Sequence, residues 1–127
     1  MEELIARVSA AAGIDAGLAT KAVGMILNFL QKEGPAAEVS QLIGALPGAE
    51  AAMAANTGGG GLMGGLAGMM PGGGGVMGLG ASLMGAGLSM GQVQGVSKEM
   101  FAFGREKAGE DAMGAIVGAI PGLGQFV

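Results

Sequence analysis

The chain has no cysteine, histidine, tryptophan or tyrosine among its 127 residues, and each absence excludes a class of chemistry. Without cysteine there are no disulfide bonds and no thiol chemistry, so the redox compartment leaves no mark on the sequence. Without histidine, Ser-His-Asp triads and His-based metal sites are excluded, and general acid–base catalysis lacks its commonest side chain. We therefore expect a protein that is not an enzyme.

Aromatic side chains are also scarce, because four phenylalanines are the only ones in the chain. The core must then be built from leucine, isoleucine, valine, methionine and alanine, and small side chains each bury little apolar area. A core of this kind is thin for a short chain. Self-association is a common way for a small domain to gain the stability that its own core lacks.

Charge is missing from one long part of the chain. Residues 1–50 carry nine charged side chains and residues 98–127 carry seven, but residues 51–97 carry none. The net charge is −4, and no stripe of basic residues interleaved with aromatics is present, so nucleic acid is not an expected partner. Glu2 and Glu3 stand where a secretory signal would have basic residues, which predicts a cytoplasmic protein.

Residues 1–50 predict a series of amphipathic helices. A first short helix ends at Gly13, and Asp15 is a good N-cap for a second. We expect Gly34 to adopt the left-handed conformation that ends the second helix, and Pro35 to begin the third. The apolar faces, at spacings of three and four residues, are Leu4, Ile5 and Val8; then Leu18, Ala22, Met25, Ile26, Phe29 and Leu30; then Val39, Leu42, Ile43 and Leu46.

The last part of the chain follows the same plan. Ser89 and Gln92 form a capping-box pattern, and Gly109 is expected to end the helix that follows. The apolar faces predicted here are Val93, Val96, Met100 and Phe103, then Ile116, Val117 and Ile120. Glu110 and Asp111 suit the first turn of the last helix.

Two short segments suggest an internal repeat. LIGALPG at 42–48 and IVGAIPG at 116–122 are identical or conservatively changed at all seven positions. Upstream, LQKEGPAAEV and REKAGEDAMG align with a shift of one residue. We interpret the pattern as two related helical hairpins. Gly44 and Gly118 lie inside predicted helices, and we expect a neighbouring helix to approach them closely, which would offset their poor helical propensity.

The middle of the chain is rich in glycine and methionine, with 16 glycines and 6 methionines in residues 58–91. A flexible linker would expose twelve bulky apolar side chains, which favours aggregation. A membrane span needs about 20 predominantly apolar residues, and residues 76–90 are too few, although two short helices near 60–70 and 76–90 would make a hairpin. The third reading is a closely packed helical element. In it, Gly78, Ser82, Gly85 and Ala86 lie on one side of the helix, and Val76, Leu79, Leu83 and Leu88 lie broadly on the other. The row of Gly78, Ser82 and Ala86, four residues apart, is also of the type that packs membrane helices.

The sequence gives little support for phosphate binding, metal binding or acid–base catalysis. The glycine runs at 58–61 and 72–75 lack the lysine that follows a phosphate-binding loop. The methionines show no spaced pattern typical of copper sites, and methionine is an ordinary filler of cores. No cofactor, metal or small-molecule substrate is expected, and no catalytic residue is assigned.

The whole chain resembles small bacterial helical proteins, rich in alanine and glycine, whose domains have no known function. The resemblance rests on MEELIARVSAAAGIDAGLATKAVGMILNFLQKEG, on VSQLIGALPG, on the Gly/Met/Leu-rich middle and on the closing IVGAIPGLGQFV. It implies helical hairpins and no particular activity.

The sequence thus predicts an all-α fold with two related hairpins, at 1–56 and 89–127, joined by a partly helical segment at 57–88. We expect a structural protein that self-associates into a homo-oligomer, the partner being the chain itself. Membrane insertion of the uncharged segment and binding of a small apolar ligand or lipid are the alternatives. The expected packing residues are Leu62, Leu66, Met69, Met70, Val76, Gly78, Leu79, Ser82, Leu83, Ala86 and Leu88.

Overall fold

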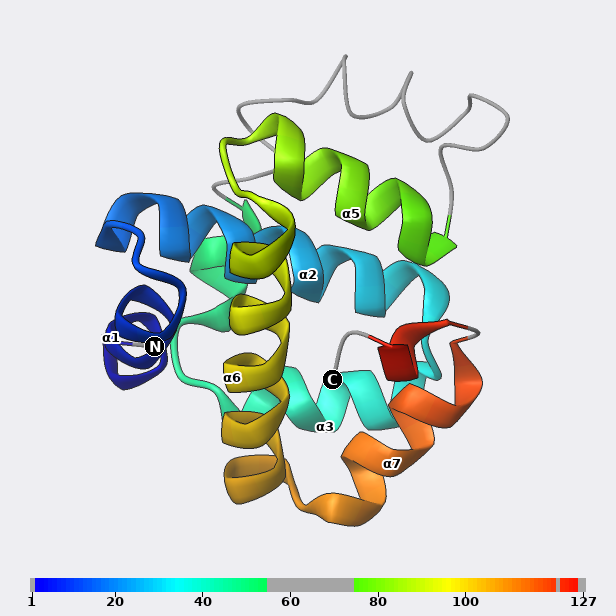
Figure 1. The fold of residues 1–127 in the computed structure, drawn as a ribbon. Helices are drawn as coiled ribbons and strands as arrows, with labels where there is room; N and C mark the ends of the chain where they lie inside the picture. Colours follow the sequence, from blue (N-terminus) through cyan, green and yellow to red (C-terminus); the bar gives the residue numbers. More distant parts are fainter. Residues whose placement is uncertain (1, 55–74, 121, 126–127) are drawn as a thin grey trace.

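The computed structural model describes residues 2–54, 75–120 and 122–125, and every regular element within them is a helix (Figure 1). The all-α prediction is confirmed. The elements are α1 (Glu2–Ala12), α2 (Ala16–Glu33), α3 (Ala36–Ala45), a helical stretch at 49–54, α5 (Gly75–Gly85), α6 (Met90–Ala108), α7 (Glu110–Ala119) and the 3₁₀ turn η1 (Leu123–Gln125).

Local signals place most helix ends where the sequence predicts them. The Asp15 carboxylate accepts a hydrogen bond from the Leu18 backbone N–H and caps α2. Ser89 and Gln92 form the reciprocal capping box of α6. Gly13, at φ +69°, follows α1, and Gly109, at φ +100°, ends α6. Both adopt a conformation that residues with a Cβ rarely take.

The two long helices, α2 and α6, form the centre of the molecule, and the shorter helices pack around them (Figure 1). Helix α1 contacts both α2 and α6, and so does α5. Helix α3 lies against α2, α6 and α7. Each long helix therefore contacts segments from both ends of the chain, and neither end forms a core by itself.

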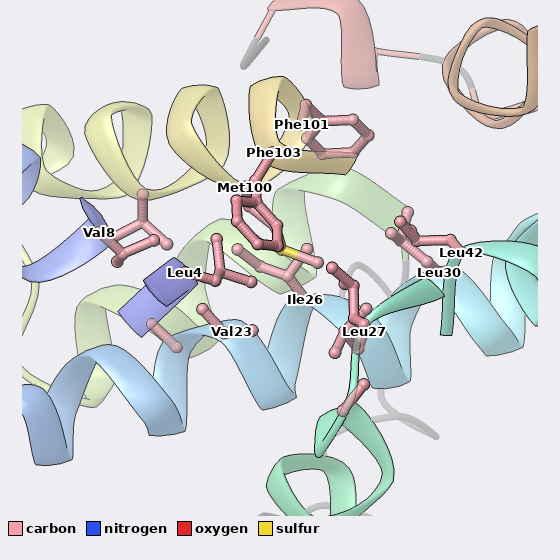
Figure 2. Close-up of a cluster of buried hydrophobic side chains, with 14 of the residues drawn as sticks. Leu4, Val8, Val23, Ile26, Leu27, Leu30, Leu42, Met100, Phe101 and Phe103 are labelled. Atoms are coloured by element: carbon pink, nitrogen blue, oxygen red, sulfur yellow. The ribbon is translucent and has the colours of Figure 1, made fainter. Parts of the chain in front are cut away.

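Side chains from α1, α2, α3 and α6 meet in the core (Figure 2). Met100, Phe101 and Phe103 of α6 are at most 3% exposed. The predicted face of α6 is thus correct but too narrow, because it omits Phe101. In α2 the buried face is rotated: Val23 and Leu27 are fully buried, whereas Leu18, Met25 and Phe29 are partly exposed. Contacts from several neighbouring helices, rather than one, widen and shift the buried face.

Three glycine predictions are wrong. Gly34 is not left-handed, since its φ is −89° and its ψ is 173°. Glycine is required there because a Cβ would lie 2.7 Å from the Leu30 carbonyl oxygen. Gly44 and Gly118 are not closely approached: among the described residues, no atom lies within 4 Å of a Cβ built at either position.

The helix expected over 76–90 is also shorter than predicted. Helix α5 ends at Gly85, and Gly87, at φ +118°, turns the chain before α6 begins at Met90. Leu88 therefore lies in the connection rather than on the helix, where it is still buried. The second short helix, expected near 60–70, lies outside the described residues.

Several helix boundaries in the two halves of the described chain lie 74 residues apart. Helix α3 begins at Ala36 and α7 at Glu110, 74 residues later. The N-caps Asp15 and Ser89 are separated by the same number. The C-caps Leu46 (φ −109°, ψ 96°) and Ile120 (φ −108°, ψ 109°) have similar backbone conformations.

Candidate interaction surface

An open groove of about 710 Å³ lies between α1, the start of α2 and the stretch that follows α3. Its lining is mostly apolar and consists largely of small side chains: Ile5, Ala6, Ser9 and Ala10 from α1, Ala16 and Thr20 from α2, and Gly48, Ala51 and Ala52 beyond α3. Among the described residues of this lining, Glu2 is the one with an ionisable side chain. A groove of this composition suits an apolar partner rather than a charged substrate.

The groove arises because α1 has two different apolar faces. Leu4 and Val8 are fully buried in the core, and α1 packs closely on α6. Ala6 and Ala10 are exposed on the side of the groove. Leu4 and Val8 therefore anchor α1 in the core, while Ala6 and Ala10 remain exposed in the groove.

A second, much smaller cavity lies among α2, α5, α6 and η1. Leu79, Leu83 and Leu123 help to line it, and it measures only about 10 Å³. Leu83 and Leu123 are at most 1% exposed.

Arg7 is the centre of the charged side-chain interactions that join the two ends of the chain. Its Nε donates a hydrogen bond to Glu99 Oε2 at 3.3 Å, and its Nη1 donates one to Glu106 Oε2. The guanidinium also lies 5.4 Å from the ring centre of Phe103. Both carboxylates are thus engaged in an ion pair that holds α1 on α6, an arrangement typical of a structural role.

The ion pair predicts a small dependence of stability on pH. The hydrogen bond from Arg7 and its positive charge lower the pKa of Glu106 below its usual value of 4.5. A carboxylate whose pKa is lower in the folded state stabilises the fold above the unfolded pKa, and this contribution is lost as the pH falls through the folded pKa. The effect is small because the Glu106 side chain is 59% exposed.

We expect Glu106→Gln to lower the melting temperature slightly at neutral pH and to leave it unchanged well below pH 4.5. Thermal unfolding followed by circular dichroism over a pH series measures this difference. Glu33→Gln, which removes an exposed carboxylate at the end of α2, is the charge-matched control. A Glu106→Gln deficit that persisted at low pH would show that the side chain acts through packing instead.

A second, polar groove of about 510 Å³ lies where α3 meets the α6–α7 junction, and Glu38, Glu110 and Asp111 contribute to it. Glu110 and Asp111 occupy the first turn of α7, as the sequence predicts. Within the described ranges, no group of three or more Asp or Glu residues is placed to hold a metal ion. These carboxylates are explained by the helix N-terminus, where negative charge is favourable.

The predicted packing residues have several different environments. Leu62, Leu66, Met69, Met70 and the side chain of Val76 lie outside the described part of the chain. Gly78, Leu83 and Leu88 are buried, and Leu79 and Ala86 are partly buried against the same core. Ser82 is exposed. The row of small residues at 78, 82 and 86 therefore does not share one environment.

Two methionines that the sequence did not single out remain exposed. Met84 of α5 is 47% exposed and Met90, at the start of α6, is 58% exposed. They are the large hydrophobic residues with high exposure among those that the structure describes. No charged residue occurs between 75 and 97, the stretch of sequence that carries both methionines. Periodicity did not identify them, because a stripe of apolar residues does not show which of its edges another helix covers.

No single helix of the described chain is long and apolar enough to cross a membrane. Helices α1 and α2 together have a suitable length and composition, but they are bent 106° from each other. Most of the apolar side chains of α2 are buried in the core.

The chain matches no protein-family model, no curated protein and no solved structure. The resemblance to bacterial proteins of unknown function stays a prediction from the sequence.

Proposed function

We propose that this chain is a non-catalytic structural protein that self-associates into a homo-oligomer. The observation that carries the proposal is the exposure of Met84 and Met90, which are 47% and 58% exposed and lie in a stretch of sequence, 75–97, without a charged residue. Scattered apolar residues are normal on a protein surface, but an apolar region without charge is typical of an interaction site.

A second copy of the chain is the partner that this surface suits best. The chain is acidic overall, with a net charge of −4, so two copies repel each other wherever their carboxylates meet. The region 75–97 has no charged residue, and contact through it avoids that repulsion. Methionine is unbranched and polarizable, which suits contacts between surfaces that are not perfectly complementary.

We also propose that the protein consists of two related units, each larger than the hairpins inferred from sequence. The offset of 74 residues brings α1 into correspondence with α5, α2 with α6 and α3 with α7, within a residue at each end. Buried positions correspond as well, since Val39 and Met113 are both buried, and so are Leu42 and Ile116. The first helix of each unit packs on the long helix of the other. Units that interlock in this way resemble the two subunits of a dimer joined in one chain.

Light scattering on the purified chain, coupled to size-exclusion chromatography, tests self-association. We expect a mass that is a multiple of 12.2 kDa at micromolar concentration and that falls on dilution. A well-folded monomer over this whole range of concentration would reject the proposal.

The membrane alternative is tested with the same preparation. Flotation of the intact chain with phospholipid vesicles would favour lipid as the partner of the uncharged segment. If the chain stays at the bottom of the gradient while light scattering gives a multiple of the chain mass, the homo-oligomer is supported over the membrane.

A further inference from the structure

Met84 and Met90 stand at positions that correspond to two residues of the open groove. Ala10 precedes Met84 by 74 residues, and Ala16 precedes Met90 by the same number. Both alanines line the groove. The end of α5 and the start of α6 therefore carry two exposed methionines. At the corresponding positions, the end of α1 and the start of α2 carry two alanines that line the groove.

We propose that the groove between α1, α2 and the stretch at 49–54 receives Met84 and Met90 of a second copy. This inference rests on the proposed self-association and names the two surfaces that meet. It commits to a heterologous pair of surfaces, a methionine protrusion on one copy and an alanine-lined groove on the other.

The sizes of the two surfaces support the pairing. The groove, at about 710 Å³, is in the range of pockets that hold substantial apolar groups. Its small side chains, such as Ala6 and Ala51, leave room for the long unbranched side chain of methionine.

The charges of the two surfaces are also compatible. Glu2 is the ionisable residue of the groove lining, so an incoming acidic surface would be repelled. The segment that carries Met84 and Met90 contributes no carboxylate, because residues 75–97 contain neither Asp nor Glu. Other surfaces of the chain, such as the start of α7 with Glu110 and Asp111, would bring negative charge toward Glu2.

The first test replaces both methionines. Glutamine keeps the unbranched shape of methionine but is costly to bury without hydrogen-bond partners. We expect Met84→Gln/Met90→Gln to weaken self-association roughly tenfold or more, measured by sedimentation velocity over a concentration series. Both side chains are exposed in one copy, so helical content should be unchanged. Ala115→Gln, on the exposed side of α7, is the matched control and should assemble as the original chain does.

The second test fills the groove. Ala10→Met introduces in the first half the residue that stands at the equivalent position of the second half. Because Ala10 is exposed, we expect the variant to fold normally and to lose self-association to the same degree as the double glutamine variant. If Ala10→Met assembles like the original chain while the methionine variant does not, the methionines bind elsewhere and the groove assignment is wrong.

A cross-linking experiment tests the pairing directly, since the chain has no cysteine of its own. A chain with Ala51→Cys is mixed with a chain with Met90→Cys, and a short bismaleimide is added. We expect a cross-linked species of twice the chain mass that contains one chain of each kind. A mixture in which Lys21→Cys replaces Ala51→Cys should give much less product, because Lys21 is not part of the groove lining. Equal yields from the two mixtures would overturn the inference.

The outcomes separate this inference from the proposed function. If the original chain assembles and the methionine variant assembles equally well, self-association stands and the named surfaces are wrong. If the original chain is a monomer, the proposed function fails and the inference fails with it. If native mass spectrometry finds an apolar small molecule that Ala10→Met removes while the oligomer persists, the groove binds a ligand rather than a second copy, and the inference is overturned.

Discussion

Replacement of Phe101 by alanine should lower the free energy of unfolding by about 3–5 kcal/mol, a large part of the total stability of a small domain. Phe101 is 1% exposed and helps to line a small cavity with Ile26, Leu83 and Leu123, which come from both halves of the chain. Its removal would leave a void that these side chains cannot fill, because each is held by its own helix or turn.

Urea denaturation followed by circular dichroism measures this loss as a lower transition midpoint at an unchanged slope. Phe29→Ala is the matched control, since Phe29 is only partly buried against the same core. We expect its cost to be clearly smaller. If the two variants lose equal amounts of unfolding free energy, the full burial of Phe101 between the two halves of the chain contributes no more stability than the partial burial of Phe29.

Gly34→Ala should destabilise the protein by about 1–3 kcal/mol. A Cβ at this position would lie 2.7 Å from the Leu30 carbonyl oxygen and 2.9 Å from Val39 Cγ2. The carbonyl belongs to the backbone of α2 and also accepts the Gly34 N–H at 2.7 Å, so it cannot move aside without loss of that hydrogen bond. The connection between α2 and α3 would have to shift instead.

Gly44→Ala provides a control of opposite sign. Gly44 lies in α3 with no described atom within 4 Å of a built Cβ, and its φ is not positive. Alanine there should raise the free energy of unfolding by roughly 0.5–1 kcal/mol, because glycine loses more conformational freedom on forming a helix. Thermal unfolding of Gly34→Ala and Gly44→Ala measures the two changes in stability. A loss of stability in Gly44→Ala would show that a neighbouring segment approaches α3 at this position.

The helix ends were the most predictable part of the fold. Asp15, Ser89 and Gly109 act within one or two turns of the backbone, so their residue types are enough to place an end. Gly34 shows the limit of such reasoning. Its role depends on the position of Val39 in the next helix as well as on its own conformation, and a sequence pattern does not contain that distance.

The buried faces were predicted less completely than the helices themselves. A single apolar stripe identifies one contact surface, but α6 contacts α1, α2, α3, α5 and α7. Phe101 and Ser97 are buried because neighbours approach α6 from several sides. The groove was missed for a related reason. Ala6 and Ala10 look like ordinary exposed helix residues, and only the position of the stretch at 49–54 makes them one side of a hollow.

The sequence by itself determined the all-helical fold, the caps of the long helices and the absence of histidine- and cysteine-based chemistry. These follow from residue type and from spacing over a few positions. The tertiary structure decided which glycines are tightly packed, which methionines stay exposed and where the groove lies. Each of these depends on how closely segments distant in the sequence approach one another.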